Sequence, residues 1–151
     1  MTRSRDSQRQ KVYDWERRSV TAFREGISLD ECRKFAAKVC RANHFHVDVT
    51  DGRGRRTPCA YSYRICLPTG SRTRAIVLHE LAHCMVQQSF HWSWITVAAH
   101  GPEFMRVYMW LLQRYHQQSL RTLRATAKLC RVKYAPPRVV SNVRAILEVT
   151  I

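Results

Sequence analysis

Hydrophobic and polar positions follow a helical period over much of the chain. Several segments place apolar residues three or four positions apart, the spacing of an amphipathic helix with one buried face. Ser28-Leu29-Asp30-Glu31 has the pattern of a capping box, and Pro102 suits the first position of a helix. The pattern therefore predicts helices at about residues 6–23, 28–42, 71–88, 102–112 and 120–130.

Between the second and third of these helices the apolar positions repeat every two residues instead of every three or four. Residues 45–49 alternate apolar and polar side chains, and residues 60–67 carry β-branched and aromatic ones, so each segment predicts a strand. Asp51-Gly52-Arg53-Gly54 indicates a turn between them, which favours an antiparallel pair. We therefore expect an α+β fold that is mostly helical, with a small antiparallel sheet packed on the helix at 71–88.

The length of the chain, 151 residues, fits one domain with a single modest core. We expect residues 1–130 to form this domain. Pro136-Pro137 interrupts the pattern that follows, so residues 131–151 are expected to form a C-terminal tail, either a short strand or an arm.

Composition and charge narrow the class of protein. Lys and Arg number 26 against 11 Asp and Glu, a formal net charge of +15, which favours contact with DNA or another polyanion. No apolar run reaches the roughly 18–20 residues that a membrane helix needs, and the polar N-terminus lacks a secretory signal. We expect a cytoplasmic protein whose six cysteines, none in a Cys-x-x-Cys pair, are free thiols.

The strongest chemical signal is the motif His79-Glu80-Leu81-Ala82-His83. In a helix, positions i and i+4 lie on one face, so both imidazoles can reach one zinc ion. Glu80 projects beside the ion, where its carboxylate can deprotonate a water molecule. The plainer interpretation is two partly exposed histidines on an amphipathic helix. It is disfavoured because two His and a Glu are costly in so apolar a helix without a purpose.

A catalytic zinc commonly takes three protein ligands, so a third must come from elsewhere in the chain. His100 is the preferred candidate because it lies 17 residues after His83, close enough for a loop to return it to the helix face. Gly101 permits an unusual backbone beside it. Glu103 and His91 are the alternatives.

The segments Leu78–His83 and Ala99–Phe104 resemble the SprT-like minimal zincins, in which a His-Glu-x-x-His helix is followed by His-Gly-x-x-Phe. The chain is similar, over about residues 5–130, to putative metallohydrolases of actinobacteria and their phages. The features that carry this similarity are Arg5–Arg9, Lys11–Tyr13, Asp51–Arg56 and Thr73-Arg74.

The resemblance implies a zincin-like fold with His79, His83 and His100 as ligands of one zinc ion and Glu80 as general base. It also implies that the strand near residues 60–67 is an edge that holds an extended substrate. Tyr61 and Tyr63 are candidate substrate contacts on that strand. Either of them, Tyr108 or an Arg is a candidate oxyanion donor.

Three functions are compatible with these residues. The leading one is a zinc metallopeptidase acting on a protein or peptide, near DNA if the charge reflects such contact. The alternative is a basic nucleic-acid-binding accessory protein, of a phage or a bacterium, with a structural zinc site whose Arg-rich segments contact phosphates. The third is hydrolysis of a non-peptide amide or ester by the same activation of water.

Overall fold

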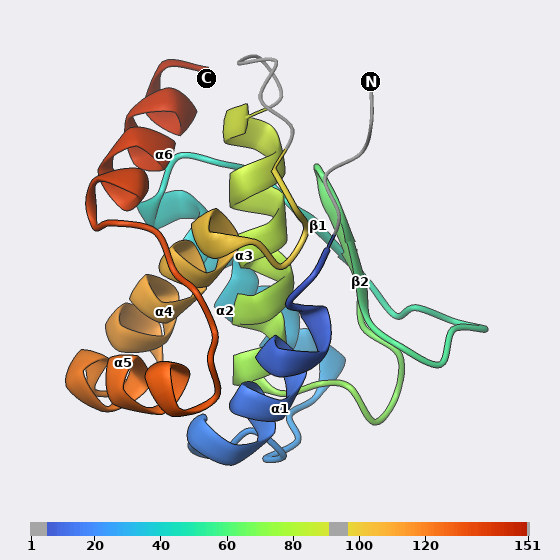
Figure 1. Ribbon diagram of the computed structural model, residues 1–151. Helices are drawn as coiled ribbons and strands as arrows, with labels where there is room; N and C mark the ends of the chain where they lie inside the picture. Colours follow the sequence, from blue (N-terminus) through green and yellow to red (C-terminus); the bar gives the residue numbers. More distant parts are fainter. Residues whose placement is uncertain (1–5, 91–96, 151) are drawn as a thin grey trace.

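Helix α3, Arg74–Phe90, lies at the centre of the computed structural model, which describes residues 6–90 and 97–150 (Figure 1). Twelve of its 17 residues are buried, so the helix is enclosed on nearly all sides. A helix that is apolar almost all round belongs in a core. The His-Glu-x-x-His motif therefore lies in the interior of the molecule.

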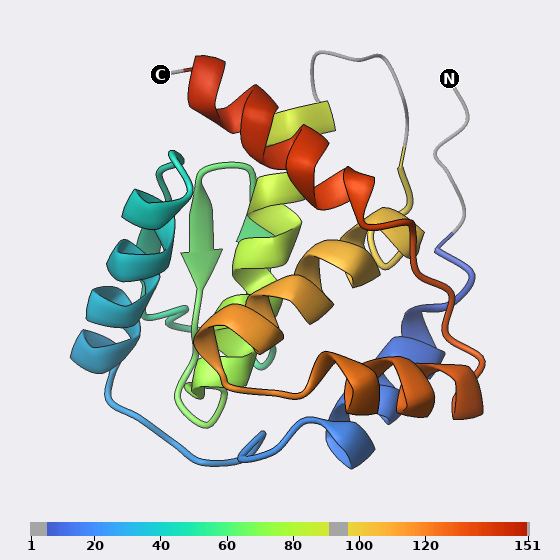
Figure 2. The ribbon, with the colours of Figure 1, turned by 90° about the vertical axis from the view of Figure 1, so that its left-hand side faces the viewer.

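Five further helices surround α3 in the described part of the chain. Helices α2, α4 and α6 pack directly on α3, whereas α5 packs against α1 and α4 (Figures 1 and 2). Their bounds are Arg9–Ser19 for α1, Leu29–Ala42 for α2, Pro102–Tyr115 for α4, Leu120–Leu129 for α5 and Arg138–Val149 for α6.

The two local helix signals in the sequence are confirmed. Ser28 Oγ accepts a hydrogen bond from the Glu31 amide at 3.1 Å, and Glu31 Oε2 accepts one from the Ser28 amide at 2.8 Å, which completes the capping box of α2. Pro102 occupies the first turn of α4, behind Gly101 as N-cap. The first helix is shorter than predicted, since α1 covers Arg9–Ser19 rather than residues 6–23.

The small sheet is mixed, which corrects the predicted antiparallel pair. Its strands are β1, Asp48–Thr50, β2, Cys59–Tyr61, and β3, Arg64–Cys66, in the order β1-β3-β2. Strand β1 pairs parallel with β3, and β2 pairs antiparallel with β3. The predicted strand at 60–67 is a hairpin, because Ser62-Tyr63 turns the chain and β3 returns between its two neighbours. This turn carries no Gly or Asn, the usual signal of a two-residue hairpin.

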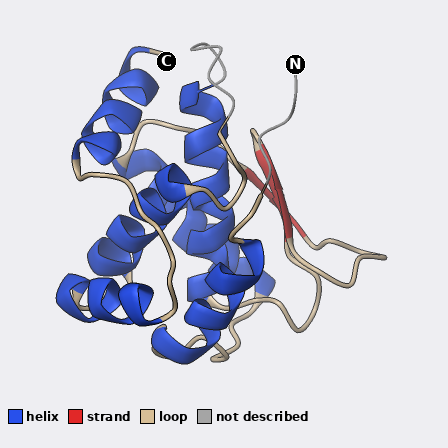
Figure 3. Cartoon of the chain, viewed as in Figure 1, coloured by secondary structure: helices blue, strands red, loops and turns tan. Residues whose placement is uncertain are grey.

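The sheet lies on one side of the helices, with β2 packed against α3 (Figure 3). Ile65 of the central strand is fully buried and joins the core. Strand β2 forms the outer edge nearest α3. All six cysteines are free thiols, as predicted.

The segment after residue 131 is not a strand or an arm. Residues 138–149 form α6, whose Val140, Val143 and Leu147 are buried against α3 and α4. The two prolines precede this helix instead of ending the ordered chain, because the apolar residues beyond them have helical spacing. The domain boundary at residue 130 stays a prediction.

In the part of the chain that the structure describes, no helix is both long enough and apolar enough to cross a membrane.

Candidate metal centre

Three histidines converge at one end of a cavity. His79 and His83 come from successive turns of α3, and His100 comes from the segment that enters α4. One nitrogen from each ring lies within 4.8 Å of the others. The Nε2 atoms of His79 and His83 are 3.1 Å apart. The i, i+4 spacing thus places its two imidazoles as the sequence predicts, and the preferred third histidine joins them.

Two carboxylates orient the rings from behind. His79 Nδ1 lies 2.9 Å from Glu16 Oε1 of α1, and His100 Nδ1 lies 2.8 Å from Asp6 Oδ2. An ionised carboxylate only accepts hydrogen bonds, so each Nδ1 donates, and in the neutral imidazole the lone pair is then on Nε2. Such carboxylate–histidine pairs fix the tautomer of a metal ligand and raise its basicity. The sequence identified neither acidic residue as a partner of the histidines.

The nitrogen atoms fit a divalent metal ion. His100 Nε2 is buried and has no hydrogen-bond partner, although an isolated buried acceptor is costly. Two ligands at 2.0–2.1 Å from a tetrahedral zinc lie about 3.3 Å from each other, close to the separation of His79 and His83 Nε2. One ion at this point would satisfy all three lone pairs. A set of imidazoles suits zinc and neighbouring transition metals.

His100 is held by residues that precede α1. The Asp6 carboxylate accepts from both the backbone amide of His100, at 3.0 Å, and its ring. The Gln8 side-chain amide donates to the His100 carbonyl at 2.8 Å and to the Lys133 carbonyl at 3.0 Å. The N-terminal segment therefore fixes the backbone and the ring of His100 together.

Glu103 and His91 were the alternative candidates for the third ligand. Glu103 lies in the first turn of α4 and does not belong to the three-histidine cluster. Its Oε2 lies 3.2 Å from where a Cβ on Gly101 would be. His91 lies outside the described residues.

Gly101 and Phe104 complete the support of the cluster. Gly101 has ordinary extended backbone, φ −71°, so the unusual conformation that a glycine permits is not used here. The glycine gives space instead, because a Cβ would lie 3.1 Å from the Ala98 carbonyl oxygen, a tight contact. Phe104, fully buried, stacks on the His83 ring with centroids 4.3 Å apart and also contacts the other two imidazoles. It forms an apolar floor beneath the three rings.

Burial and charge set the protonation of the imidazoles. Burial, with the neighbouring charges of His79 and His100, lowers the pKa of His83 well below its usual value. Burial also lowers the pKa of His100, and its hydrogen bond to Asp6 partly opposes this. For His79, burial lowers the pKa, but Glu16 and Glu80 together outweigh it and raise the pKa. His83 and His100 are thus held as neutral imidazoles, the form that binds metals.

Glu80 is buried next to the cluster, with 5% of its surface exposed, and it lines the cavity. Burial raises the pKa of Glu80 to about 7, while the neighbouring His79 lowers it in part. The carboxyl group can therefore exchange a proton near neutrality, as a general acid–base group must.

The cavity has a volume of about 810 Å³ and is bounded by α1, β2, α3 and the segment before α4. Arg9 and Tyr13 of α1 line it, two residues that belong to the segments similar to the putative metallohydrolases but to which the sequence assigned no role in the site. The Arg9 guanidinium lies 3.4 Å from the Tyr13 hydroxyl, to which it donates, and the Tyr13 ring lies edge-on to His100. Both side chains offer donors to a ligand near the histidines.

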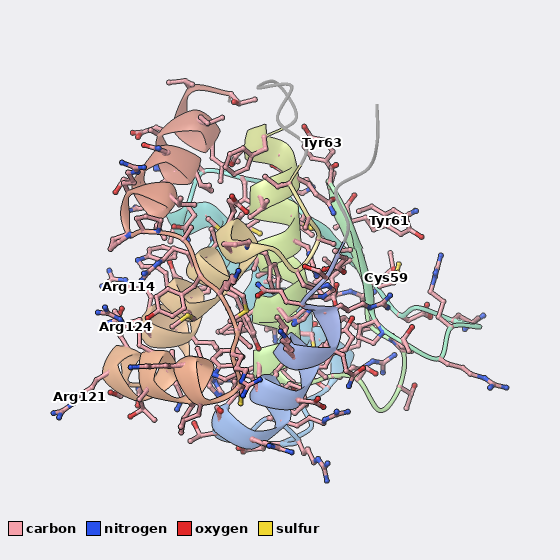
Figure 4. The ribbon with its side chains drawn as sticks, viewed as in Figure 1. Cys59, Tyr61, Tyr63, Arg114, Arg121 and Arg124 are labelled. Carbon is pink, nitrogen blue, oxygen red and sulfur yellow. The ribbon has the colours of Figure 1, made fainter. Side chains whose placement is uncertain are left out.

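Tyr61 and Tyr63 do not line this cavity. They are 44% and 58% exposed, and Figure 4 shows Tyr61 projecting from the sheet away from the helices. Tyr108 is buried beneath the site and donates its hydroxyl to Glu16, so it supports the His79 ring from behind. A role of Tyr61 and Tyr63 in substrate binding stays a prediction.

Comparisons of the chain with protein families, curated proteins and solved structures find no match. The arrangement of three histidines is therefore the part of the resemblance to SprT-like zincins that the structure supports. The rest of that resemblance stays a prediction. The function is inferred from the geometry of this centre.

Proposed function

We propose that this protein is a zinc-dependent hydrolase with a zincin-like arrangement, and that it is a peptidase. One observation carries the proposal. The Nε2 lone pairs of three oriented imidazoles meet at the wall of an open cavity, and the carboxyl group of Glu80 lines the same wall. A metal site that opens on a cavity is typical of catalysis rather than of a closed structural site.

The residues around the cavity divide the chemistry between them. When bound, zinc lowers the pKa of water and polarises the carbonyl group under attack. His79, His83 and His100 hold the ion. Glu80 accepts the proton of the attacking water and passes it to the leaving amine. The Tyr13 hydroxyl and the guanidinium of Arg9, an arginine being one of the donors considered from the sequence, face the negative charge that develops on the carbonyl oxygen.

The edge of the sheet supports a peptide as substrate. Strand β2 is one of the two edge strands of the sheet, and Cys59 and Ala60 of this strand line the cavity beside Glu80. Among the described residues, no backbone hydrogen bond joins the outer edge of β2 to another segment. An extended peptide can add to such an edge and place its backbone across the metal centre. A small amide or ester would not use this edge.

The decisive experiment compares Glu80→Gln with the wild type and with Glu103→Gln. The control removes an equal charge from a half-buried glutamate outside the histidine cluster. All three proteins should contain one zinc per chain by mass spectrometry of the metal. Cleavage of casein and of quenched fluorescent peptides should stop only in Glu80→Gln. Wild-type protein without stoichiometric metal, or full cleavage by Glu80→Gln, refutes the proposal.

The alternative function is a basic nucleic-acid-binding accessory protein in which zinc stabilises the fold. The burial of the ligands favours it, since His79 and His100 are each only 5% exposed. It predicts that zinc-loaded protein cleaves neither casein nor the peptides and that Glu80→Gln changes no property of the protein. Removal of zinc would then lower the melting temperature without loss of any turnover.

A further inference from the structure

The C-terminal third of the chain has an unusual charge distribution. Between Phe104 and Leu147 there are nine basic residues and no acidic one. All eleven Asp and Glu of the protein lie outside this stretch. The basic residues are Arg106, Arg114, Arg121, Arg124, Lys128, Arg131, Lys133, Arg138 and Arg144.

Eight of these nine side chains are exposed, Arg106 being buried. Within residues 6–90 and 97–150, no salt bridge involves any of the nine. Their positive charges are therefore neutralised by no carboxylate of the described chain. A field of one sign attracts a polyanion and is strongest where no opposite charge interrupts it.

Four of the cations form one surface, which we call the arginine face: Arg114, Arg121, Arg124 and Lys128. The last three lie at i, i+3 and i+7 of α5, which places them on one side of that helix. Figure 4 shows Arg114, Arg121 and Arg124 projecting from the same edge of the molecule, and Figure 2 views this side, with α4, α5 and α6 toward the reader.

The arginine face lies on the other side of α3 from the cavity. The cavity is bounded by α1, β2, α3 and residues 97–100, and no residue of α4, α5 or α6 lines it. In Figure 4 the labelled arginines and the labelled residues of β2 stand at opposite sides of the molecule. A large ligand on the arginine face would therefore leave the metal centre accessible.

We propose that the arginine face binds the phosphodiester backbone of a nucleic-acid duplex, without reading its sequence. Guanidinium groups match phosphate oxygens with two parallel hydrogen bonds. Arg121 and Lys128 are seven residues apart, about 10 Å along the helix, which spans about three phosphates at 3.4 Å per charge along one strand. This inference holds whether or not the metal centre is catalytic.

The aromatic residues of this region favour a duplex over a single strand. Single-stranded nucleic acid is bound by stacking bases on open aromatic rings. Here the Trp110 ring is covered by the Arg144 guanidinium at 5.3 Å, and the Tyr134 ring by Arg106 at 4.8 Å. Among the described residues, the exposed large hydrophobic side chains of α4, α5 and α6 are Leu129 and Val149, neither of them aromatic. The side thus offers charge and almost no stacking surface.

The test measures binding of the full-length protein to fluorescent 24-base-pair DNA and RNA duplexes by anisotropy at several salt concentrations. One variant carries Arg114→Gln, Arg121→Gln and Arg124→Gln. The matched control removes three exposed positive charges elsewhere on the protein: Arg24→Gln, Arg41→Gln and Arg56→Gln. Zinc content and circular dichroism of both variants establish that they fold and keep the metal centre.

The arginine-face variant should bind at least tenfold more weakly at 0.1 M salt. The negative slope of its log K against log salt concentration should be shallower by about two to three, because each lost phosphate contact reduces the magnitude of the slope by about 0.9. The control should stay within about threefold of the wild type. Equal losses in both triple variants, no duplex binding by the wild type, or tighter binding to a single strand of the same length would each overturn the proposal. DNA and RNA duplexes bound alike agree with it, and a preference for one identifies the source of the phosphates.

Discussion

Glu16 is predicted to determine how tightly the three histidines hold zinc. Its buried carboxylate accepts hydrogen bonds from His79 Nδ1, at 2.9 Å, and from the Tyr108 hydroxyl. The Glu16→Gln variant keeps the shape and one acceptor oxygen but removes the charge that makes the His79 imidazole a better ligand. Loss of such an orienting partner typically weakens metal affinity by about 10–100-fold, which corresponds to about 1.4–2.7 kcal/mol.

The assay is competition for zinc with a chromophoric chelator at pH 7.5. Glu25→Gln is the matched control, because it removes the same charge from an exposed position that does not line the cavity. Circular dichroism checks that both variants are folded without metal. Zinc affinity of Glu16→Gln within about threefold of both the wild type and the control would refute the role assigned to Glu16.

Three further predictions concern single residues. Tyr13→Phe should keep zinc binding and lower kcat for peptide cleavage by about 10–100-fold with little change in KM, because the ring stays and only the donor is lost; unchanged kcat would exclude Tyr13 as a donor. Gly52→Ala should destabilise the fold by about 1–3 kcal/mol in urea denaturation, since φ is +61° and a Cβ would lie 2.7 Å from the Pro68 nitrogen; wild-type stability would contradict this. Ser28→Ala should cost about 0.5–2 kcal/mol by the same measurement, and no loss would show that the capping box with Glu31 is dispensable.

The features that the sequence determined are those that depend on residues within one or two helical turns. The spacing of His79 and His83 fixes both rings on one face of any helix that contains them. The capping box at Ser28 and Glu31 involves atoms three residues apart, and Pro102 favours a helix start by its own fixed φ. Hydrophobic period indicated five of the six described helices, because apolar residues three or four positions apart gather on the side that packs in the core, whereas α6 was expected to be a tail.

The tertiary structure alone decided which distant groups meet these local features. Glu16 lies 63 residues before His79, and Asp6 lies 94 residues before His100, so no periodic pattern connects either pair. The order of the strands depended on a hairpin turn at residues 62–63, which contains no Gly or Asn that would mark it in the sequence. This turn brings β3 back between β1 and β2, so that β3 pairs on both sides. Hydrogen bonds between segments so far apart in the chain depend on how every helix packs around α3. For this reason the sequence predicted the imidazole ligands, whereas the carboxylates that orient them and the cavity donors emerged only from the fold.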